Sequence, residues 1–217
     1  MVHPEIGSTA LWPMMLLGAY HGINPGMGWL FAVALGMQEH KGSAVARSLV
    51  PIALGHALAI GVVVLAAAFL GMALPRETIR YSVAALLFGL GVFSLVRHYH
   101  PRWVRMKVGF RDLTVWSFLM ASAHGAGLMV VPVLLGSSTV KAADPMAGHH
   151  HMPAVVSPLQ ALLATGVHTA AYLAATGLIA WVVYSKVGLA ILRKAWLNLN
   201  VVWAVALVVT GLVTLVM

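Results

Sequence analysis

Four histidines lie inside long apolar stretches of the chain, at His21, His56, His124 and His168. Each is about eight to ten residues from the start of its stretch, which along a helix with a rise of 1.5 Å per residue places all four roughly 12–15 Å deep. A polar side chain that faces lipid at such a depth is costly, so the imidazoles are expected to face one another, a cavity or a bound ion. Their shared depth predicts one transition-metal site near the bilayer midplane. The alternative is that each ring is satisfied separately by a backbone carbonyl or a neighbouring helix.

The segment that follows His21 offers further ligands. It contains Asn24, Pro25 and three glycines. Proline cannot donate to a helix and glycine weakens one, so the helix is expected to break between residues 24 and 28, with a milder break after His124. Broken backbone at membrane depth is tolerated where it lines a cavity, which makes the Asn24 amide a candidate ligand. The thioethers of Met27 and Met129 are also candidate ligands, and they would favour Cu(I). Their spacing from His21 and His124 does not match one helix face, so ligation requires the helix breaks.

The composition indicates an integral membrane protein of the all-α class. The 217 residues are 61% hydrophobic and 8% charged, with a mean hydropathy of +0.92, so a charged, solvated surface is not available. There is no cysteine, which excludes thiolate ligands and disulfides. The formal net charge of +8 comes from Lys and Arg between the apolar stretches. That placement favours anionic lipid headgroups over nucleic acid as the partner.

Six apolar stretches are long enough to cross a bilayer, and residues 1–217 form a single transmembrane domain. The stretches cover residues 11–37, 48–74, 80–97, 114–136, 158–184 and 197–217. Ten of the 13 Lys and Arg residues lie in the first, third and fifth connections and three in the others. By the positive-inside tendency the odd connections are cytoplasmic, so we expect both termini outside a cytoplasmic (inner) membrane.

The fourth connection, residues 137–157, is then an external loop. Three imidazoles lie there between two thioethers, at Met146, His149, His150, His151 and Met152. Such a group gathers borderline or soft cations, so the loop is expected to collect Cu, Ni, Co or Zn for the site in the membrane. A solvated loop of accidental composition is the alternative.

The two halves of the chain, about 11–97 and 114–217, resemble each other. Ala19-Tyr-His21-Gly22 in the first stretch corresponds to Ser122-Ala-His124-Gly125 in the fourth, and His56 in the second corresponds to His168 in the fifth. Two units of three spans have opposite orientations because three is odd. The sequence therefore predicts an inverted repeat, which is typical of transporters whose discontinuous helices bind substrate near the midplane.

At these residues the sequence resembles the nickel/cobalt transporter-like (NicO) family of the wider LysE-type exporter superfamily, as a divergent member. The resemblance rests on His21-Gly-Ile-Asn-Pro25-Gly-Met-Gly28, where the family often has His-Ala-x-x-Pro-Gly-His-Gly, and on Leu54-Gly-His56-Ala57. It implies movement of transition metals across the cytoplasmic membrane with His21 and His56 as ligands. Met27 stands where the family has a second histidine, and Trp29 stands where a lysine is common.

Three functions are open at this point. The first is a secondary transporter of a divalent or monovalent transition-metal cation of the Ni, Co, Cu, Zn or Fe class, coupled through histidine protonation. The second is an intramembrane metalloenzyme or redox protein with a copper, iron, zinc or haem centre, supported by the nearby aromatic residues Tyr20, Trp29, Trp116 and Tyr172. The third is an accessory subunit of a homo-oligomer or membrane complex, in which the histidines serve packing.

Overall fold

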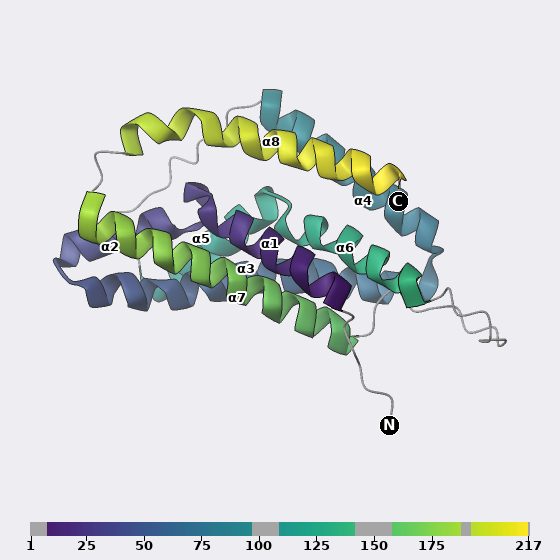
Figure 1. The fold of residues 1–217 in the computed structure, drawn as a ribbon, viewed down its shortest axis with the longest axis horizontal. Helices are drawn as coiled ribbons and strands as arrows, with labels where there is room; N and C mark the ends of the chain where they lie inside the picture. Colours follow the sequence, from purple (N-terminus) through teal and green to yellow (C-terminus); the bar gives the residue numbers. More distant parts are fainter. Residues whose placement is uncertain (1–7, 97–108, 142–157, 188–191, 217) are drawn as a thin grey trace.

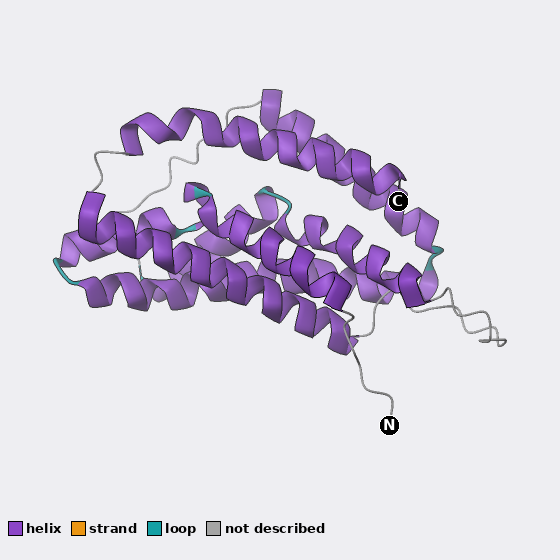
Figure 2. Ribbon diagram, in the orientation of Figure 1, coloured by secondary structure: helices purple, strands orange, loops and turns teal. Residues whose placement is uncertain are grey.

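The computed structural model describes residues 8–96, 109–141, 158–187 and 192–216. Within these ranges the chain is helical apart from short turns, and no strand occurs, which confirms the predicted all-α class (Figure 2). In chain order the elements are α1 (Ser8–Ile23), the 3₁₀ helix η1 (Pro25–Met27), α2 (Trp29–Glu39), α3 (Gly42–Ala73), α4 (Arg76–Val96), α5 (Phe110–Ala123), α6 (Ala126–Lys141), α7 (Pro158–Val182), the π-helix η2 (Val183–Val187) and α8 (Leu192–Val216).

The first apolar stretch breaks where the sequence predicts it. α1 ends at Ile23, and Pro25 begins the single 3₁₀ turn of η1, because its fixed φ suits the first helical position and its missing N–H is not needed there. Gly28 then adopts a φ of 132°, a conformation that residues with a Cβ rarely reach, and α2 begins at Trp29. The chain is therefore redirected in the middle of this stretch.

A second break separates α5 from α6. His124 ends α5, Gly125 has a φ of 68°, and the two helices meet at an angle of 56°. The break expected after His124 is therefore present. In both halves of the chain a histidine lies within three residues before the point where a helix changes direction.

The helices pack mainly in pairs that are distant in sequence. α1 runs along α7, α3 along α5, and α4 along α8, and Figure 1 shows α4 and α8 side by side at the top of the view. Glycine allows two of these pairs to approach closely. A Cβ on Gly18 would lie 2.2 Å from the carbonyl oxygen of His168, and one on Gly55 would lie 2.2 Å from the carbonyl oxygen of Thr114. Small residues at such contacts are the usual means of packing helices in lipid.

Two glycines, Gly91 and Gly211, lie at the close contact between α4 and α8. A Cβ on Gly91 would lie 3.0 Å from the backbone of Ala204 and of Val208, and one on Gly211 would lie 3.0–3.1 Å from the backbone of Phe88 and of Ala84. Partner numbers fall along α8 as they rise along α4, so the helices are antiparallel. The two contacts mirror each other, since Gly211, Ala204 and Val208 each stand 120 positions after Gly91, Ala84 and Phe88.

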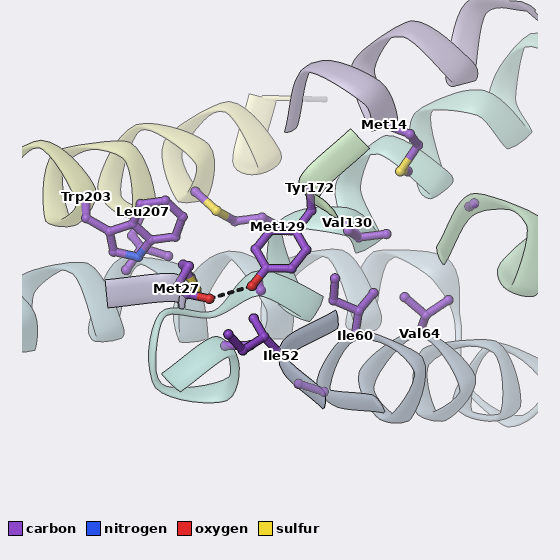
Figure 3. Close-up of a cluster of buried hydrophobic side chains, with 14 of the residues drawn as sticks. Met14, Met27, Ile52, Ile60, Val64, Met129, Val130, Tyr172, Trp203 and Leu207 are labelled. Carbon is purple, nitrogen blue, oxygen red and sulfur yellow. Dashed lines mark hydrogen bonds between the residues drawn. The ribbon is translucent and has the colours of Figure 1, made fainter. Parts of the chain in front are cut away.

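The buried core follows the inner faces of these helices. Figure 3 shows part of it, where Met14, Met27, Ile52, Tyr172 and Trp203 come together from α1, η1, α3, α7 and α8. The outer faces are apolar too, with large side chains such as Trp12, Leu16 and Val62 more than half exposed. An apolar exterior is the surface expected of helices that lie in lipid.

Three helical segments are long and apolar enough to cross a membrane: Gly42–Gly71, Arg76–Val96 and Leu162–Lys186. The bent pair Phe110–Ala123 and Ala126–Leu135 makes a fourth if it is one span, and Val201–Val216 is a shorter apolar helix. The break divides the stretch 11–37, so neither α1 nor α2 alone has the necessary length. The described residues thus support a multi-pass membrane protein with three or four such helices, and six spans stay a prediction.

The external loop is expected to begin at Ser137, and in the structure α6 continues to Lys141. The rest of that loop, with Met146, His149, His150, His151 and Met152, lies outside the described residues.

Candidate functional site

Three of the four predicted histidines meet inside the bundle. His21 at the end of α1, His56 in the middle of α3 and His168 in α7 are all fully buried. The ring centroids are 5.6 Å apart for His21 and His56, 5.0 Å for His21 and His168, and 5.5 Å for His56 and His168. These three residues are called the histidine cluster below. It brings together parts of the chain separated by up to 147 positions, from His21 to His168.

The hydrogen bonds of the cluster leave ring nitrogens free. His21 Nδ1 lies 2.7 Å from the carbonyl oxygen of Leu17 and therefore carries the proton, which leaves Nε2 as a lone pair without a partner. The Nε2 atoms of His56 and His168 lie 3.4 Å apart and share one proton when both rings are neutral. The buried Nδ1 of His56 has no partner. Buried polar atoms in native proteins are almost always satisfied, so these orphaned nitrogens indicate a place for a ligand.

The cluster is not a finished coordination sphere. Within the described ranges no three His, Asp or Glu side chains converge with the geometry that would hold a metal ion. The rings of His56 and His168 are nearly parallel, at 7° to each other, while His21 is inclined to them by 66° and 69°. Metal ligation by the three Nε2 atoms would require these rings to turn toward a common point.

His124 lies beside the cluster with a tryptophan as their common neighbour. Its Nδ1 donates to the carbonyl oxygen of Met120 at 2.8 Å, the same pattern as in His21. The indole of Trp203, from α8, contacts both rings edge to face, at 4.9 Å from His21 and 5.4 Å from His124, and its Nε1 donates to the carbonyl oxygen of His124 at 3.1 Å. Trp203 also stacks on Tyr20 at 5.0 Å. The fourth predicted histidine is therefore connected to the cluster through Trp203.

The carbonyl oxygens released at the helix break (residues 24–28) are satisfied by side chains. Gly26 N donates to Asn24 Oδ1 at 2.9 Å instead of to Gly22, whose oxygen accepts from Thr176 at 3.4 Å. The oxygen of Ile23 accepts from the Trp29 indole at 3.0 Å, and that of Met27 accepts from the Tyr172 hydroxyl. Irregular backbone at membrane depth is stable only when its polar groups are paired in this way.

One face of α7 supplies two of these contacts. His168, Tyr172 and Thr176 follow one another at intervals of four residues, and all three are fully buried. Tyr172 also stacks on His56, with centroids 3.7 Å apart and planes at 9°. Residues four apart lie on the same side of a helix, so this polar stripe in an apolar stretch was a signal that could have identified Thr176 from the sequence. No such pattern marks Trp203, because it is the one aromatic residue of the apolar stretch 197–217.

The other predicted ligands lie in different settings. Asn24 is buried and its Oδ1 caps η1. Met27 and Met129 are both buried in the apolar core, where Figure 3 shows them near Trp203 and Tyr172. Of the aromatic residues expected to support redox chemistry, Tyr20 and Tyr172 contact cluster histidines, whereas Trp29 caps Ile23 and Trp116 packs on Phe31 at 4.2 Å. Ligation by the amide or by either thioether stays a prediction.

Carboxylates in the described residues are engaged away from the cluster. Glu39 pairs with Arg47 and Glu77 with Arg80, each at 2.7 Å, and Asp112 accepts from Gly109 N at 3.1 Å at the start of α5. The ligand chemistry of the buried cluster is therefore that of imidazole, a borderline donor suited to Ni, Co, Cu, Zn or Fe.

Comparison with protein-family models, with curated proteins and with solved structures finds no match for this chain.

Proposed function

We propose that the chain is a secondary transporter of transition-metal cations in the cytoplasmic membrane, with the histidine cluster as its central binding site. The observation that carries the proposal is the meeting of three fully buried imidazoles from α1, α3 and α7, in which His21 Nε2 and His56 Nδ1 have no partner. A cation held by the three Nε2 atoms would supply the missing partner of His21 Nε2. Metal-binding histidines typically donate their other N–H to a backbone carbonyl, as His21 does to Leu17.

The spacing of His56 and His168 suits a shared ion. Two nitrogen ligands at 2.0–2.1 Å from a tetrahedral metal lie about 3.3–3.4 Å from each other. The separation of the two Nε2 atoms, 3.4 Å, is of that size. The cation would lie between the two Nε2 atoms, and the ring that carries its proton on Nε2 would bind as the other tautomer, with that proton on Nδ1. Small rotations of the three rings would then complete the site.

The transport mechanism requires two alternating halves, and we propose that they are two inverted repeats of three spans each. The antiparallel contacts of Gly91 and Gly211, related by an offset of 120, support a local two-fold relation between α4 and α8. Contact between the corresponding residues His56 and His168 supports an axis that passes through the cluster. Substrate sites of inverted-repeat transporters lie at such an axis.

Both breaks contribute to this proposal. Discontinuous helices in transporters line the substrate site and allow half-helices to move separately. Here the break after His21 and the 56° bend after His124 place one mobile joint in each repeat. With both termini outside, the His/Met-rich segment within residues 137–157 would face the exterior and deliver cations to the cluster.

Metal flux into proteoliposomes tests the function. The protein should move at least one of Ni²⁺, Co²⁺, Zn²⁺ and Cu⁺, and His56→Ala and His168→Ala should abolish that flux because each removes a ligand. His40→Asn is the matched control, since His40 is an exposed histidine with a φ of 53° that asparagine tolerates. Wild-type flux in both cluster variants would refute the proposal.

A redox metalloprotein is the second candidate, and the aromatic shell favours it. Tyr172 lies against His56, while Tyr20 and Trp203 lie against His21. Buried phenol and indole rings beside a metal are oxidisable groups. A haem absorption band or a stoichiometric, non-exchangeable metal in the purified protein would favour this function, whereas readily exchanged metal would favour transport.

A further inference from the structure

Tyr172 touches both the histidine cluster and the helix break. Its side chain is fully buried, and its ring lies flat on the imidazole of His56, with centroids 3.7 Å apart and planes at 9°. At the far end of the ring the hydroxyl donates to the carbonyl oxygen of Met27, as the dashed line in Figure 3 shows. One rigid side chain therefore spans from a cluster histidine to η1.

The Met27 carbonyl needs this donor. In a continuous helix it would accept from the N–H of Phe31, but that N–H donates to the oxygen of Gly28 at 3.0 Å. Gly28 itself, at a φ of 132°, turns the chain away from helical geometry. The helix break leaves the Met27 oxygen without its helical donor, and the Tyr172 hydroxyl takes that place. Loss of the hydroxyl leaves a buried acceptor unpaired.

Motion of His56 is transmitted to Tyr172 by packing. Two parallel rings in face contact inside a close-packed interior cannot turn independently, because each occupies the space that the other would enter. Rotation of His56 toward a cation therefore shifts Tyr172, and a shift of its ring changes the hydrogen bond to Met27.

We propose that Tyr172 is a positioning residue that couples cation binding at the histidine cluster to the conformation of the helix break. This inference rests on the proposed function. Binding at His56 displaces the Tyr172 ring, weakens or strengthens its bond to Met27, and so sets whether α1 and α2 move as one body or two. Movement of half-helices at a break is how alternating access is achieved in transporters of this kind.

Hydrogen exchange of residues 22–31 with and without cation measures the coupling directly. The probe is whichever of Ni²⁺, Co²⁺, Zn²⁺ and Cu⁺ shows the fastest flux in wild-type proteoliposomes. In wild type the cation should change the exchange of this segment. In Tyr172→Phe, which keeps the stacked ring and removes the hydroxyl, that change should disappear and flux should fall about tenfold, while cation affinity stays within about threefold.

Two controls separate coupling from simple stabilisation. Thr210→Val removes a hydroxyl on α8 that donates to the carbonyl oxygen of Ala206, and should leave the response to cation in place. Tyr81→Phe removes the hydroxyl of an exposed tyrosine on α4 and should behave as wild type. Retained cation binding in each variant shows that it is folded.

The outcomes distinguish the coupling from the function. An unchanged exchange response and flux in Tyr172→Phe would overturn the coupling and leave the transport proposal intact. Loss of cation affinity in Tyr172→Phe would also overturn it, because the residue would then only support the cluster. Absence of both cation binding and flux in the wild type would overturn the proposed function and the coupling together.

Discussion

The Nε2 atoms of His56 and His168 lie 3.4 Å apart across 112 positions of sequence, with ring planes at 7°. Each histidine comes from the middle of a long helix, and α3 and α7 are in contact. Two residues that correspond in the proposed repeats can touch only where their symmetry axis passes. The contact therefore gives the bundle a centre, around which His21, His124 and Trp203 are arranged.

The first prediction concerns this histidine pair. His56→Ala and His168→Ala should each weaken cation binding by about 100-fold or more, because either change removes a ligand and leaves the partner ring unpaired. The double variant should be little worse than either single one, since the two residues act as one unit. Isothermal titration in detergent measures all three, with His40→Asn as the control. Additive losses would contradict the shared site.

The second prediction tests the α4–α8 register. Gly91→Ala and Gly211→Ala should each lower stability by about 1–3 kcal/mol, because the new methyl would meet backbone 3.0–3.1 Å away that cannot easily give way. Gly89→Ala is the matched control on the same helix, since nothing lies within 4 Å of its Cβ position. Thermal unfolding in detergent compares the three. A loss confined to one of the two contact glycines would argue against the two-fold relation.

The third prediction concerns Trp203. Trp203→Ala should weaken cation binding by about tenfold, because it leaves a cavity beside His21 and His124 and removes the donor to the His124 carbonyl. Trp203→Phe, which keeps an aromatic ring, should have a smaller effect. Trp12→Ala is the control, since that indole is mostly exposed on the outer face of α1. Equal affinity in Trp203→Ala and wild type would mean that the indole only fills space.

The local features of the fold were predictable from the sequence and the contacts between helices were not. Pro25 and the neighbouring glycines specify the helix break through their own backbone preferences, so the sequence alone locates it. Depth along each stretch likewise brought His21, His56 and His168 to one level. Depth does not give the rotation of a helix about its axis, and that rotation decides that Tyr172 and Trp203 face the cluster. It also decides that His124 lies behind Trp203.

The relation between α4 and α8 was missed for a similar reason. Ala84, Leu87 and Gly91 recur as Ala204, Leu207 and Gly211, but three small or aliphatic matches between two apolar stretches carry no information until the packing shows them in mirrored contacts. The number of spans stays a prediction, because length and composition alone do not show how straight a stretch is. Apolar residues 11–37 are numerous enough for a span, whereas the break determines how much of that stretch is straight.

The last prediction concerns Gly28, where backbone strain and crowding coincide. A Cβ at this position would lie 2.5 Å from Cγ2 of Ile52, and a φ of 132° disfavours any residue with a Cβ. Gly28→Ala should therefore destabilise the protein by about 1–3 kcal/mol and lower flux. Gly26→Ala is the matched control in the same break, because its nearest neighbour, the Asn24 side chain, is 3.3 Å away.

The double variant Gly28→Ala/Ile52→Ala separates the two causes. If the clash with Ile52 dominates, relieving it should restore most of the stability lost relative to Ile52→Ala alone. If the backbone conformation dominates, no stability returns, because alanine still resists a φ of 132°. We expect the second result, since a side chain can shift by a few tenths of an ångström but the turn from η1 into α2 depends on that one dihedral angle. Full recovery in the double variant would place the constraint in α3 rather than in the break itself.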